Sequence, residues 1–215
     1  MLELENVWKV FETRQGRKEV LRGAYARIRK GEHVGILGRN GAGKSTLMRV
    51  LAGVERPTRG RVRCSMSMSW PIGKSFGIQS SLTGEANARF IARVYGTPVQ
   101  ETVDFVEDFA ELGPYFREPV RTYSSGMTSR LLMALSFSVD FECYLVDEAL
   151  STGDARFADK CRAALDLRRA DAGILLVSHN AQHVKKYCDT AAILRNGMLE
   201  FYEDVDEAIA AYQGL

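Results

Sequence analysis

The stretch GRNGAGKST, residues 38–46, has glycines, a lysine and a serine at a spacing that suits phosphate binding. It follows the apolar run 34–37 and precedes the helix-like run 45–54, which is the context that a phosphate-binding loop requires. Glycines let backbone N–H groups curl around an anion in conformations and at distances that a Cβ would block. We expect Lys44 to place its charge on the β and γ phosphates of a nucleotide, and Ser45 to bind Mg²⁺. The alternative is a glycine-rich turn that binds nothing, which the order of strand, loop and helix disfavours.

Two adjacent acids follow another apolar run and could complete such a site. Asp147 and Glu148 come directly after CYLV, residues 143–146. A magnesium-bound triphosphate needs a second carboxylate anchor at the end of a neighbouring parallel strand. Because successive side chains diverge where a strand ends, Asp147 could hold the metal through water while Glu148 orients or deprotonates the attacking water. A merely solvated strand end is the other interpretation, and the apolar residues before the acids favour the functional one.

A histidine follows the next apolar run, ILLVS, residues 174–178. His179 would lie on the carboxyl edge of the sheet, where ligands bind in open α/β folds, and could donate to a γ-phosphate oxygen. Its spacing of four from His183 could instead place a metal pair on a helix, or either residue could be structural. A zinc site needs further ligands, and His33 is the only other histidine. We favour a phosphate-contacting His179 and expect His183 to be a packing or surface residue.

The stretch YSSGMTSR, residues 123–130, places serines and a glycine at the start of a helix-like run. Serine and glycine cluster in ordinary turns, which is one interpretation of Ser124, Ser125 and Gly126. A hydroxyl and free N–H groups at a helix start could also bind a phosphate. The residues of this stretch alone leave both interpretations open.

The elements that must position these residues alternate between strands and helices. The runs 34–37, 143–147 and 174–178 are short, apolar and rich in branched residues, as strands buried on both faces are. Helical patterns occur at residues 45–54, 157–170 and 180–188. This alternation predicts an α/β fold with a parallel core sheet.

The two ends of the chain predict antiparallel pairs. Residues 2–11 and 19–28 read as strands on either side of a turn, which gives an antiparallel sheet at the amino end. The Asn196-Gly197 pair between 191–195 and 198–202 is a type I′ hairpin signal. A short helix, VDEAIAAYQ, is expected to follow that hairpin.

Residues 82–139 differ in character, with helix-like stretches and no strand-like run. We therefore predict a helical subdomain at about 82–139, inserted into a core with a β subdomain at about 1–81 and 140–215. Because no flexible linker separates them, residues 1–215 are expected to form a single domain whose two parts move as lobes.

The composition argues against nucleic-acid binding, secretion and membrane insertion. The 29 Lys and Arg residues against 27 Asp and Glu leave a net charge of +2, too balanced to indicate a nucleic-acid partner. The acidic start, MLELENVWKV, does not resemble a secretory signal, and no run reaches the roughly 18 apolar residues of a membrane helix. Four cysteines without a CxxC pair indicate reduced thiols rather than a disulfide framework.

Four motifs in this order resemble those of the nucleotide-binding subunits of ABC transporters: the glycine loop, YSSGM, YLVDE and the SH that follows the next strand. The resemblance covers essentially the whole chain. It implies a P-loop NTPase fold of the ABC ATPase type, with a parallel core sheet, an antiparallel β subdomain and a helical subdomain. It also implies that the chain binds ATP and Mg²⁺ and is an ATPase.

The resemblance identifies GRNGAGKST as the Walker A loop and YLVDE as the Walker B strand. Its implied nucleotide-binding residues in the loop are Gly38, Asn40, Gly41, Gly43, Lys44, Ser45 and Thr46. In this family His179 corresponds to the switch histidine, and Asp154 to the aspartate of the D-loop. Phe11 lies where the family places an aromatic ring against adenine.

The resemblance also assigns Gln79 and YSSGM. Gln79 matches the Q-loop glutamine, which contacts Mg²⁺ or the attacking water and links the helical lobe to the membrane partner. YSSGM matches the family signature, so Ser124, Ser125 and Gly126 would bind the nucleotide of a second subunit. This signature departs from the usual pattern, because Ser125 replaces the first glycine and Met127 the glutamine.

Within the family, the stretches SMSMSWPIG, SLTGEANARF, EPVRTYSSGM and ARFADKC are most similar to the ATPases that export capsular polysaccharide from Gram-negative bacteria. This resemblance implies a homodimer in which the phosphate loop of each subunit faces the signature of the other. It implies an integral membrane permease as partner, a polysaccharide that need not touch this chain, and a location on the cytoplasmic face of the inner membrane.

Other functions would use similar motifs. Exporters of O-antigen or teichoic acid share them, and a soluble ABC ATPase such as an iron–sulfur assembly subunit would share the site without a membrane partner. A DNA-repair ABC ATPase would need a long coiled coil, and no sustained heptad run is present. A phosphate-loop kinase would transfer phosphate to an acceptor and would not need YSSGM.

Overall fold

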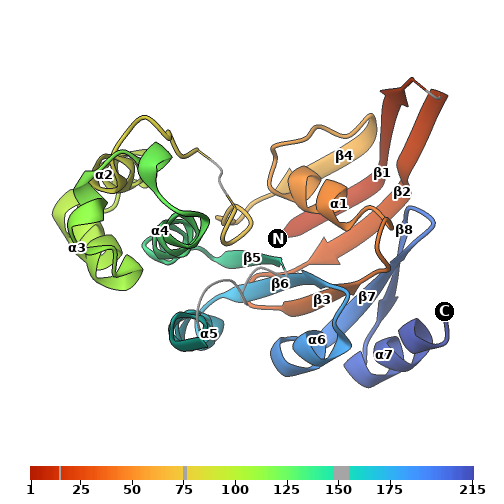
Figure 1. Ribbon diagram of the computed structural model, residues 1–215. Coiled ribbons are helices and arrows are strands. Elements are labelled where there is room, and N and C mark those ends of the chain that lie inside the picture. Colours follow the sequence, from red (N-terminus) through yellow and green to blue (C-terminus); the bar gives the residue numbers. More distant parts are fainter. Residues whose placement is uncertain (15, 75–76, 148–154) are drawn as a thin grey trace. The chain divides into compact units, whose positions relative to one another are not determined.

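The computed structural model describes residues 1–14, 16–74, 77–147 and 155–215. The chain divides into two compact units, which are shown with their element labels in Figure 1. The core unit comprises residues 1–71, 142–148 and 169–215, and the helical unit comprises residues 72–141 and 149–168. The domain boundaries expected from the sequence stay a prediction.

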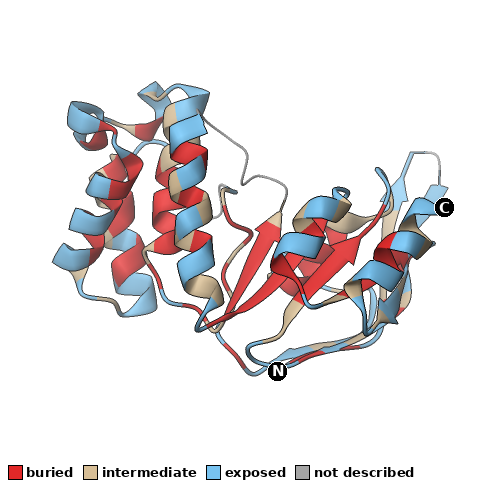
Figure 2. Ribbon diagram, turned by 90° about the horizontal axis from the view of Figure 1, so that it is seen from below, coloured by how far each residue is buried: buried red, intermediate tan, exposed pale blue. Residues whose placement is uncertain are grey.

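A five-stranded sheet forms the centre of the core unit, in the order β5-β6-β3-β7-β8. Its strands are β3 (His33–Leu37), β5 (Cys143–Asp147), β6 (Gly173–Ser178), β7 (Thr190–Arg195) and β8 (Met198–Tyr202). The first four in spatial order pair in parallel, and β8 pairs antiparallel with β7. Most residues of the parallel strands are buried, as the red arrows in Figure 2 show, so the prediction of strands covered on both faces is confirmed.

The β7–β8 hairpin closes through the predicted two-residue turn. Asn196 and Gly197 have φ angles of 51° and 80°. Positive φ at both central positions is the requirement of a type I′ turn. The predicted helix after the hairpin is α7 (Val205–Gln213), which Asp204 caps by accepting from the N–H groups of Asp206 and Glu207.

A three-stranded antiparallel sheet, in the order β2-β1-β4, forms the second layer of the core unit. Two of its strands were predicted, β1 (Leu2–Thr13) and β2 (Gly16–Ile28), and both run further into the connecting turn than expected. The third, β4 (Arg59–Cys64), was missed. Its sequence, RGRVRC, alternates arginines with non-polar residues, but Val62 is its only branched apolar residue and no residue of the strand is fully buried. Pairing with β1 rather than burial therefore defines it as a strand.

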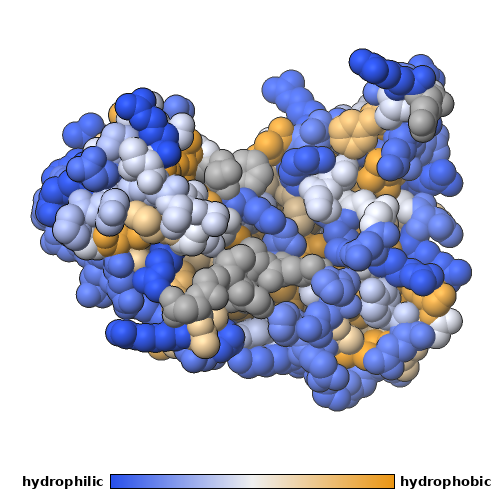
Figure 3. Space-filling model, in the orientation of Figure 1, coloured by the Kyte–Doolittle hydropathy of each residue, from blue (hydrophilic) through white to orange (hydrophobic). Residues whose placement is uncertain are grey.

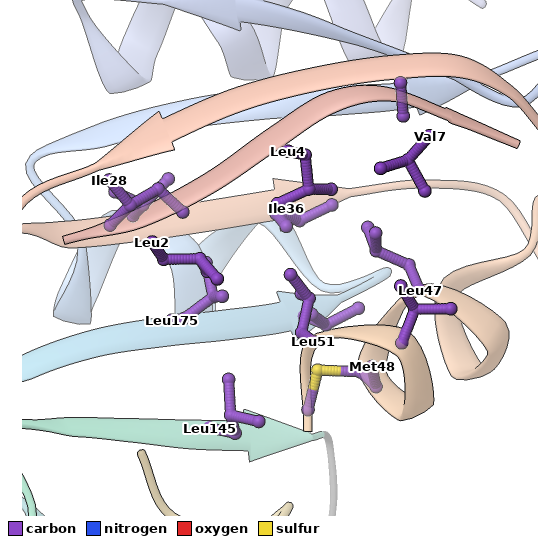
Figure 4. Close-up of a cluster of buried hydrophobic side chains, with 14 of the residues drawn as sticks. Leu2, Leu4, Val7, Ile28, Ile36, Leu47, Met48, Leu51, Leu145 and Leu175 are labelled. Atoms are coloured by element: carbon purple, nitrogen blue, oxygen red, sulfur yellow. The ribbon is translucent and has the colours of Figure 1, made fainter. Parts of the chain in front are cut away.

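Helix α1 (Lys44–Leu51) packs between the two sheets (Figures 1 and 4). Its Leu47, Met48 and Leu51 lie in one buried cluster with residues of both sheets. Leu2, Leu4 and Val7 enter this cluster from the antiparallel sheet, and Ile36, Leu145 and Leu175 from the central sheet. Full burial of a leucine side chain stabilises a fold by about 1.5–3 kcal/mol, so this cluster fixes α1 and the loop that precedes it.

The helical unit contains the elements predicted for the insertion at about 82–139, which are α2 (Gly84–Tyr95), α3 (Val99–Ala110) and α4 (Ser125–Phe137). It also contains most of α5 (Ala155–Arg169), a helix that was predicted from its pattern but assigned to the core part of the chain. Two short 3₁₀ helices, Gly113–Arg117 and Val120–Thr122, connect α3 to α4. The ring of Phe109 lies 5.7 Å from that of Phe137 and 5.9 Å from that of Phe157, so aromatic packing joins α3, α4 and α5.

No helix in the described ranges is both long enough and apolar enough to span a bilayer. The face of the molecule shown in Figure 3 is mainly hydrophilic, with apolar side chains in small groups.

Candidate nucleotide-binding site

The predicted phosphate loop connects the carboxyl end of β3 to the start of α1. Gly41 and Gly43 have φ angles of 84° and 105°, in the left-handed region that side chains with a Cβ rarely adopt. The Leu47 N–H donates to the Gly43 carbonyl over 2.9 Å and closes the first helical turn. Within the described part of the chain no side chain caps this helix start, so its first N–H groups can bind an anion.

Residues of two neighbouring strands, β2 and β7, pack closely against glycines of the loop. A Cβ on Gly43 would lie 2.7 Å from Cγ1 of Val20 in β2, closer than real contacts allow. A Cβ on Gly38 would lie 3.3 Å from the carbonyl oxygen of Leu194 in β7. Close packing therefore favours glycine at both positions, and at Gly43 the left-handed backbone conformation favours it as well.

Lys44 folds back onto the loop that it follows. Its Nζ donates to the Gly38 carbonyl over 2.7 Å and to the Arg39 carbonyl over 3.3 Å. The ammonium thus lies at the inner side of the loop, where a phosphate would meet both its charge and the helix N-terminus. Ser45 is exposed, whereas Thr46 is 7% exposed. These residues fit the phosphates of a nucleotide, because a glycine cradle, an uncapped helix start and an ammonium coincide.

Three neighbouring parallel strands bring the other core-unit candidates to the same edge of the sheet. Asp147 is the last residue of β5, and its register partner on β6 is Val177. His179 comes directly after β6, whose last residue, Ser178, pairs with Leu37 of β3. Since Gly38 follows Leu37, the strand ends place the phosphate loop, Asp147 and His179 along one edge. Glu148 and Asp154 lie outside the described residues.

The histidines differ in their surroundings. His179 is exposed, and the Asn180 that follows caps α6 (Ala181–Tyr187) by accepting from the Gln182 N–H over 2.9 Å. His183 is half-buried on α6. No three His, Cys, Asp or Glu side chains in the described ranges are placed to hold a metal, so the His179–His183 pair has no third ligand of these types there.

His33 lies at the amino end of β3, away from the carboxyl edge. Its Nδ1 lies 2.8 Å from Oδ2 of Asp189, and its Nε2 lies 3.2 Å from the Arg169 carbonyl oxygen. These contacts join β3 to the ends of two neighbouring segments, which is a structural role.

In the helical unit, Gln79 belongs to a loop held by one buried asparagine. The Gln79 N–H donates to Oδ1 of Asn87 over 2.9 Å, and Nδ2 of Asn87 donates to the carbonyl of Gln79 over 3.1 Å. Asn87 is 1% exposed and also donates to the Thr83 carbonyl over 2.8 Å. Both backbone groups of Gln79 are thus fixed while the residue itself is exposed.

The predicted signature forms the start of α4 in the helical unit. Ser124 is the N-cap, and its Oγ accepts from the Met127 N–H over 3.2 Å. Ser124, Ser125 and Gly126 are all exposed. A Cβ on Gly126 would meet only Oγ of Ser124, at 3.9 Å. Nothing described in this subunit therefore requires a glycine at position 126.

Residues 21–151 match the ABC transporter family. The chain belongs to that family. It is 49% identical, over all of both chains, to the capsule polysaccharide export ATP-binding protein CtrD of Neisseria meningitidis serogroup B. It is 50% identical to the ATP-binding protein BexA of Haemophilus influenzae, over 99% of this chain and 98% of that protein.

A solved dimeric ATP-binding cassette, bound to ADP and phosphate, has the same fold as this ABC ATPase. The TM-score is 0.79 at 20% identity, over 95% of this chain and 99% of the other. The prediction of an ABC ATPase fold with a parallel core, an antiparallel β subdomain and a helical subdomain is confirmed.

Described residues of the core unit of this ABC ATPase line two hollows beside the phosphate loop. One, of about 350 Å³, is lined in part by Arg39, Arg195 and Tyr212, and the other, of about 210 Å³, in part by Lys18 and Val20. Gly41 and Ala42 line both. Apart from Gly41, which was predicted, these lining residues were missed from the sequence, where no motif singled them out.

Phe11, the residue expected to contact adenine, is half-buried on β1. Nζ of Lys9 lies 4.9 Å from its ring centroid, a cation–π distance. Phe11 does not line either hollow, but its cross-strand partner Lys18 lines the smaller one. Its contact with adenine stays a prediction.

Proposed function

We propose that this chain is the ATP-hydrolysing subunit that powers export of a capsular polysaccharide through a separate membrane subunit. The observation that carries the proposal is identity of about half the residues, over essentially full length, to two ATP-binding proteins, one of them named for capsule polysaccharide export. The phosphate loop supports the ATPase part, because its glycine conformations and its lysine suit a triphosphate.

The proposed binding steps begin at the phosphate loop. The N–H groups from Gly41 to Thr46 and the ammonium of Lys44 bind the β and γ phosphates, for which Nζ of Lys44 leaves the Gly38 carbonyl. Phe11 stacks on the adenine ring. The side chains that would hold Mg²⁺ are Ser45, Asp147 and Gln79. When bound, Mg²⁺ neutralises phosphate charge.

Hydrolysis uses groups at the carboxyl edge of the sheet. Glu148 orients or deprotonates the attacking water, and His179 donates to the γ-phosphate. Ser124, Ser125 and Gly126 of a second copy supply donors to the same phosphate, and Asp154 contributes to the shared site. The exposure of the signature supports this, since its residues are accessible to a partner.

The proposed assembly is a homodimer of this chain on an integral membrane permease. ATP binding closes the dimer and hydrolysis releases it, which moves the permease. The chain then lies at the cytoplasmic face of a bacterial inner membrane, and the polysaccharide passes through the permease without contacting it.

A gene deletion with complementation tests this function. Deleting the gene in the bacterium that carries it should leave capsular polysaccharide inside the cell, detected by immunolabelling before and after permeabilisation. Wild-type protein should restore surface polysaccharide, and Glu148→Gln, which should bind ATP but hydrolyse it slowly, should not. Normal surface capsule in the deletion strain would exclude capsule export. Loss of O-antigen, teichoic acid or iron–sulfur enzyme activity instead would identify the alternative function.

A further inference from the structure

The backbone of Gln79 is held at both of its polar groups. Its N–H donates to Oδ1 of Asn87 over 2.9 Å. Its carbonyl accepts from Nδ2 of Asn87 and from the Leu82 N–H, each over 3.1 Å. A carbonyl oxygen has two lone pairs, so both are used here. The side chain of Gln79, by contrast, is exposed and forms no hydrogen bond within the described ranges.

Asn87 is buried, and its whole amide takes part in this anchor. The residue is 1% exposed. Its Nδ2 donates to the Thr83 carbonyl over 2.8 Å as well as to that of Gln79, while its Oδ1 accepts from the Gln79 N–H. A carboxylate could accept but could not donate to the two carbonyls, and a leucine could do neither. Position 87 therefore needs an acceptor and two donors at once, which a side chain of this size offers only as asparagine.

The start of α2, which carries Asn87, is itself well fixed. Thr83 caps the helix, since its Oγ1 accepts from the Ala86 N–H over 3.0 Å. Gly84 packs tightly, because a Cβ there would lie 2.7 Å from the Tyr123 hydroxyl oxygen. Groups on helices are held more precisely than groups on loops. The loop before α2 thus takes its position from a rigid element.

The residues after Gln79 have anchors that do not involve Asn87. The Ser80 carbonyl accepts from the Arg121 N–H over 2.8 Å, and the Leu82 carbonyl accepts from the Val120 N–H over 2.9 Å. These two bonds join the loop to the segment that leads into α4. Removing the Asn87 side chain should therefore release Gln79 without detaching the rest of the loop.

We propose that Asn87 is a positioning residue for ATP hydrolysis, because it holds the backbone from which the Gln79 side chain reaches the bound nucleotide. The inference rests on the proposed function, in which Gln79 is one of the side chains that would hold Mg²⁺. Ordering a side chain on binding costs less free energy when its backbone is already fixed. Asn87 touches neither the nucleotide nor the metal, so it acts only through Gln79.

Hydrogen exchange followed by NMR tests the anchor on the full-length protein without nucleotide. The Gln79 amide should exchange at least about 10-fold faster in Asn87→Ala than in the wild type, since its acceptor is lost. Thr102→Val is the matched control, because it removes another buried group of the helical unit, a hydroxyl that donates to the Pro98 carbonyl over 2.9 Å. It should leave exchange at Gln79 unchanged. A Gln79 amide that exchanges without protection in the wild type would overturn the anchor without any variant.

A double-variant cycle tests whether Asn87 acts through Gln79. Asn87→Ala should lower the rate of ATP hydrolysis by about 10-fold to 100-fold, the range for residues that support a metal ligand, and should not change ATP binding measured without Mg²⁺. Gln79→Ala should lower the rate at least as much. The double variant should be no slower than Gln79→Ala, because the side chain that Asn87 positions is already absent. Thr102→Val should hydrolyse ATP at the wild-type rate, even where its melting temperature falls as far as that of Asn87→Ala.

The outcomes separate this inference from the proposed function. Wild-type hydrolysis by Asn87→Ala, with slow hydrolysis by Gln79→Ala, would overturn the positioning role alone. A further fall in the double variant would overturn it too, because Asn87 would then act independently of Gln79. Wild-type hydrolysis by Gln79→Ala would remove the role of Gln79 and this inference together. Normal surface capsule in the deletion strain would overturn the export function but not this inference, which concerns hydrolysis.

Discussion

The phosphate loop and the signature are both glycine- and serine-rich helix starts, but their glycines differ in how closely the surrounding residues pack against them. In the phosphate loop, Gly43 has a φ of 105°, and a Cβ there would lie 2.7 Å from Val20. At the start of α4, a Cβ on Gly126 would meet nothing closer than 3.9 Å. The first glycine is required by its own subunit, whereas no residue in the described part of the chain requires the second.

The two helices also differ in their N-terminal capping. No described side chain caps α1, which leaves its first N–H groups for a ligand. Ser124 caps α4, and its Oγ accepts from the Met127 N–H. The start of α1 is thus open to an anion, whereas the start of α4 is already stabilised by its own N-cap.

The largest effect is expected from Lys44→Ala. Charge-assisted hydrogen bonds contribute about 1.5–3 kcal/mol each, so losing the ammonium should weaken ATP binding by at least about 100-fold and abolish hydrolysis. Binding of a fluorescent ATP analogue and phosphate release measure the two effects. Arg39→Ala, which removes a neighbouring cation of the loop, is the control and should have a smaller effect. Wild-type affinity in Lys44→Ala would contradict the role of the loop.

Gly126→Asp should separate binding from hydrolysis. The carboxylate would repel a nucleotide on the partner, so hydrolysis should fall about 100-fold, the range for losing one donor to developing charge. ATP binding by the isolated subunit and its melting temperature should not change, because position 126 has space. The measurements are phosphate release against protein concentration and equilibrium binding.

Gly126→Ala sharpens the same comparison. Its Cβ fits within the subunit, so any loss of hydrolysis would report close approach by a partner. Full hydrolysis in both variants would leave the signature as an ordinary helix start.

Gly43→Ala should destabilise the subunit itself. A left-handed φ costs about 1–3 kcal/mol for a residue with a Cβ, and contact with Val20 adds to this, so the free energy of unfolding should fall by about 2–3 kcal/mol. Denaturant unfolding measures the change. The double variant with Val20→Ala should recover part of the loss, because Cγ1 is then absent. Unaltered stability in Gly43→Ala would show that the loop can relax.

The smallest effect is expected from Ser124→Ala. Loss of an N-cap costs about 1 kcal/mol, which denaturant unfolding can resolve. Ser125→Ala, at an exposed position that does not cap the helix, should change stability by less than about 0.5 kcal/mol. Equal effects of the two substitutions would mean that the cap contributes nothing.

Much of the fold could be predicted from local pattern. The buried parallel strands were visible as short branched runs, and Asn196-Gly197 specified its own turn because both positions need positive φ. Helix α1 was predicted to reach residue 54 but ends at Leu51, since Gly53 takes a left-handed φ of 71°. The apolar pattern continued past that point, so periodicity alone could not place the end.

Strand β4 and the anchor of Gln79 could not be predicted. Strand β4 has a single branched apolar residue, Val62, and no fully buried one, so its sequence carries little strand signal, and the strand forms because β1 offers hydrogen-bond partners. Asn87 holds both backbone groups of Gln79, although it lies eight residues away on α2. Both features depend on which segments meet in space.

The sequence by itself therefore determined the family and most of the elements, because each motif and each strand or helix pattern is made of residues close together in the chain. Only the tertiary structure decided that Val20 supports Gly43, that Lys44 rests on the Gly38 carbonyl, and that Asn87 holds both backbone groups of Gln79. The physical reason is that these contacts depend on the packing of strands and on side-chain directions, which local spacing does not specify.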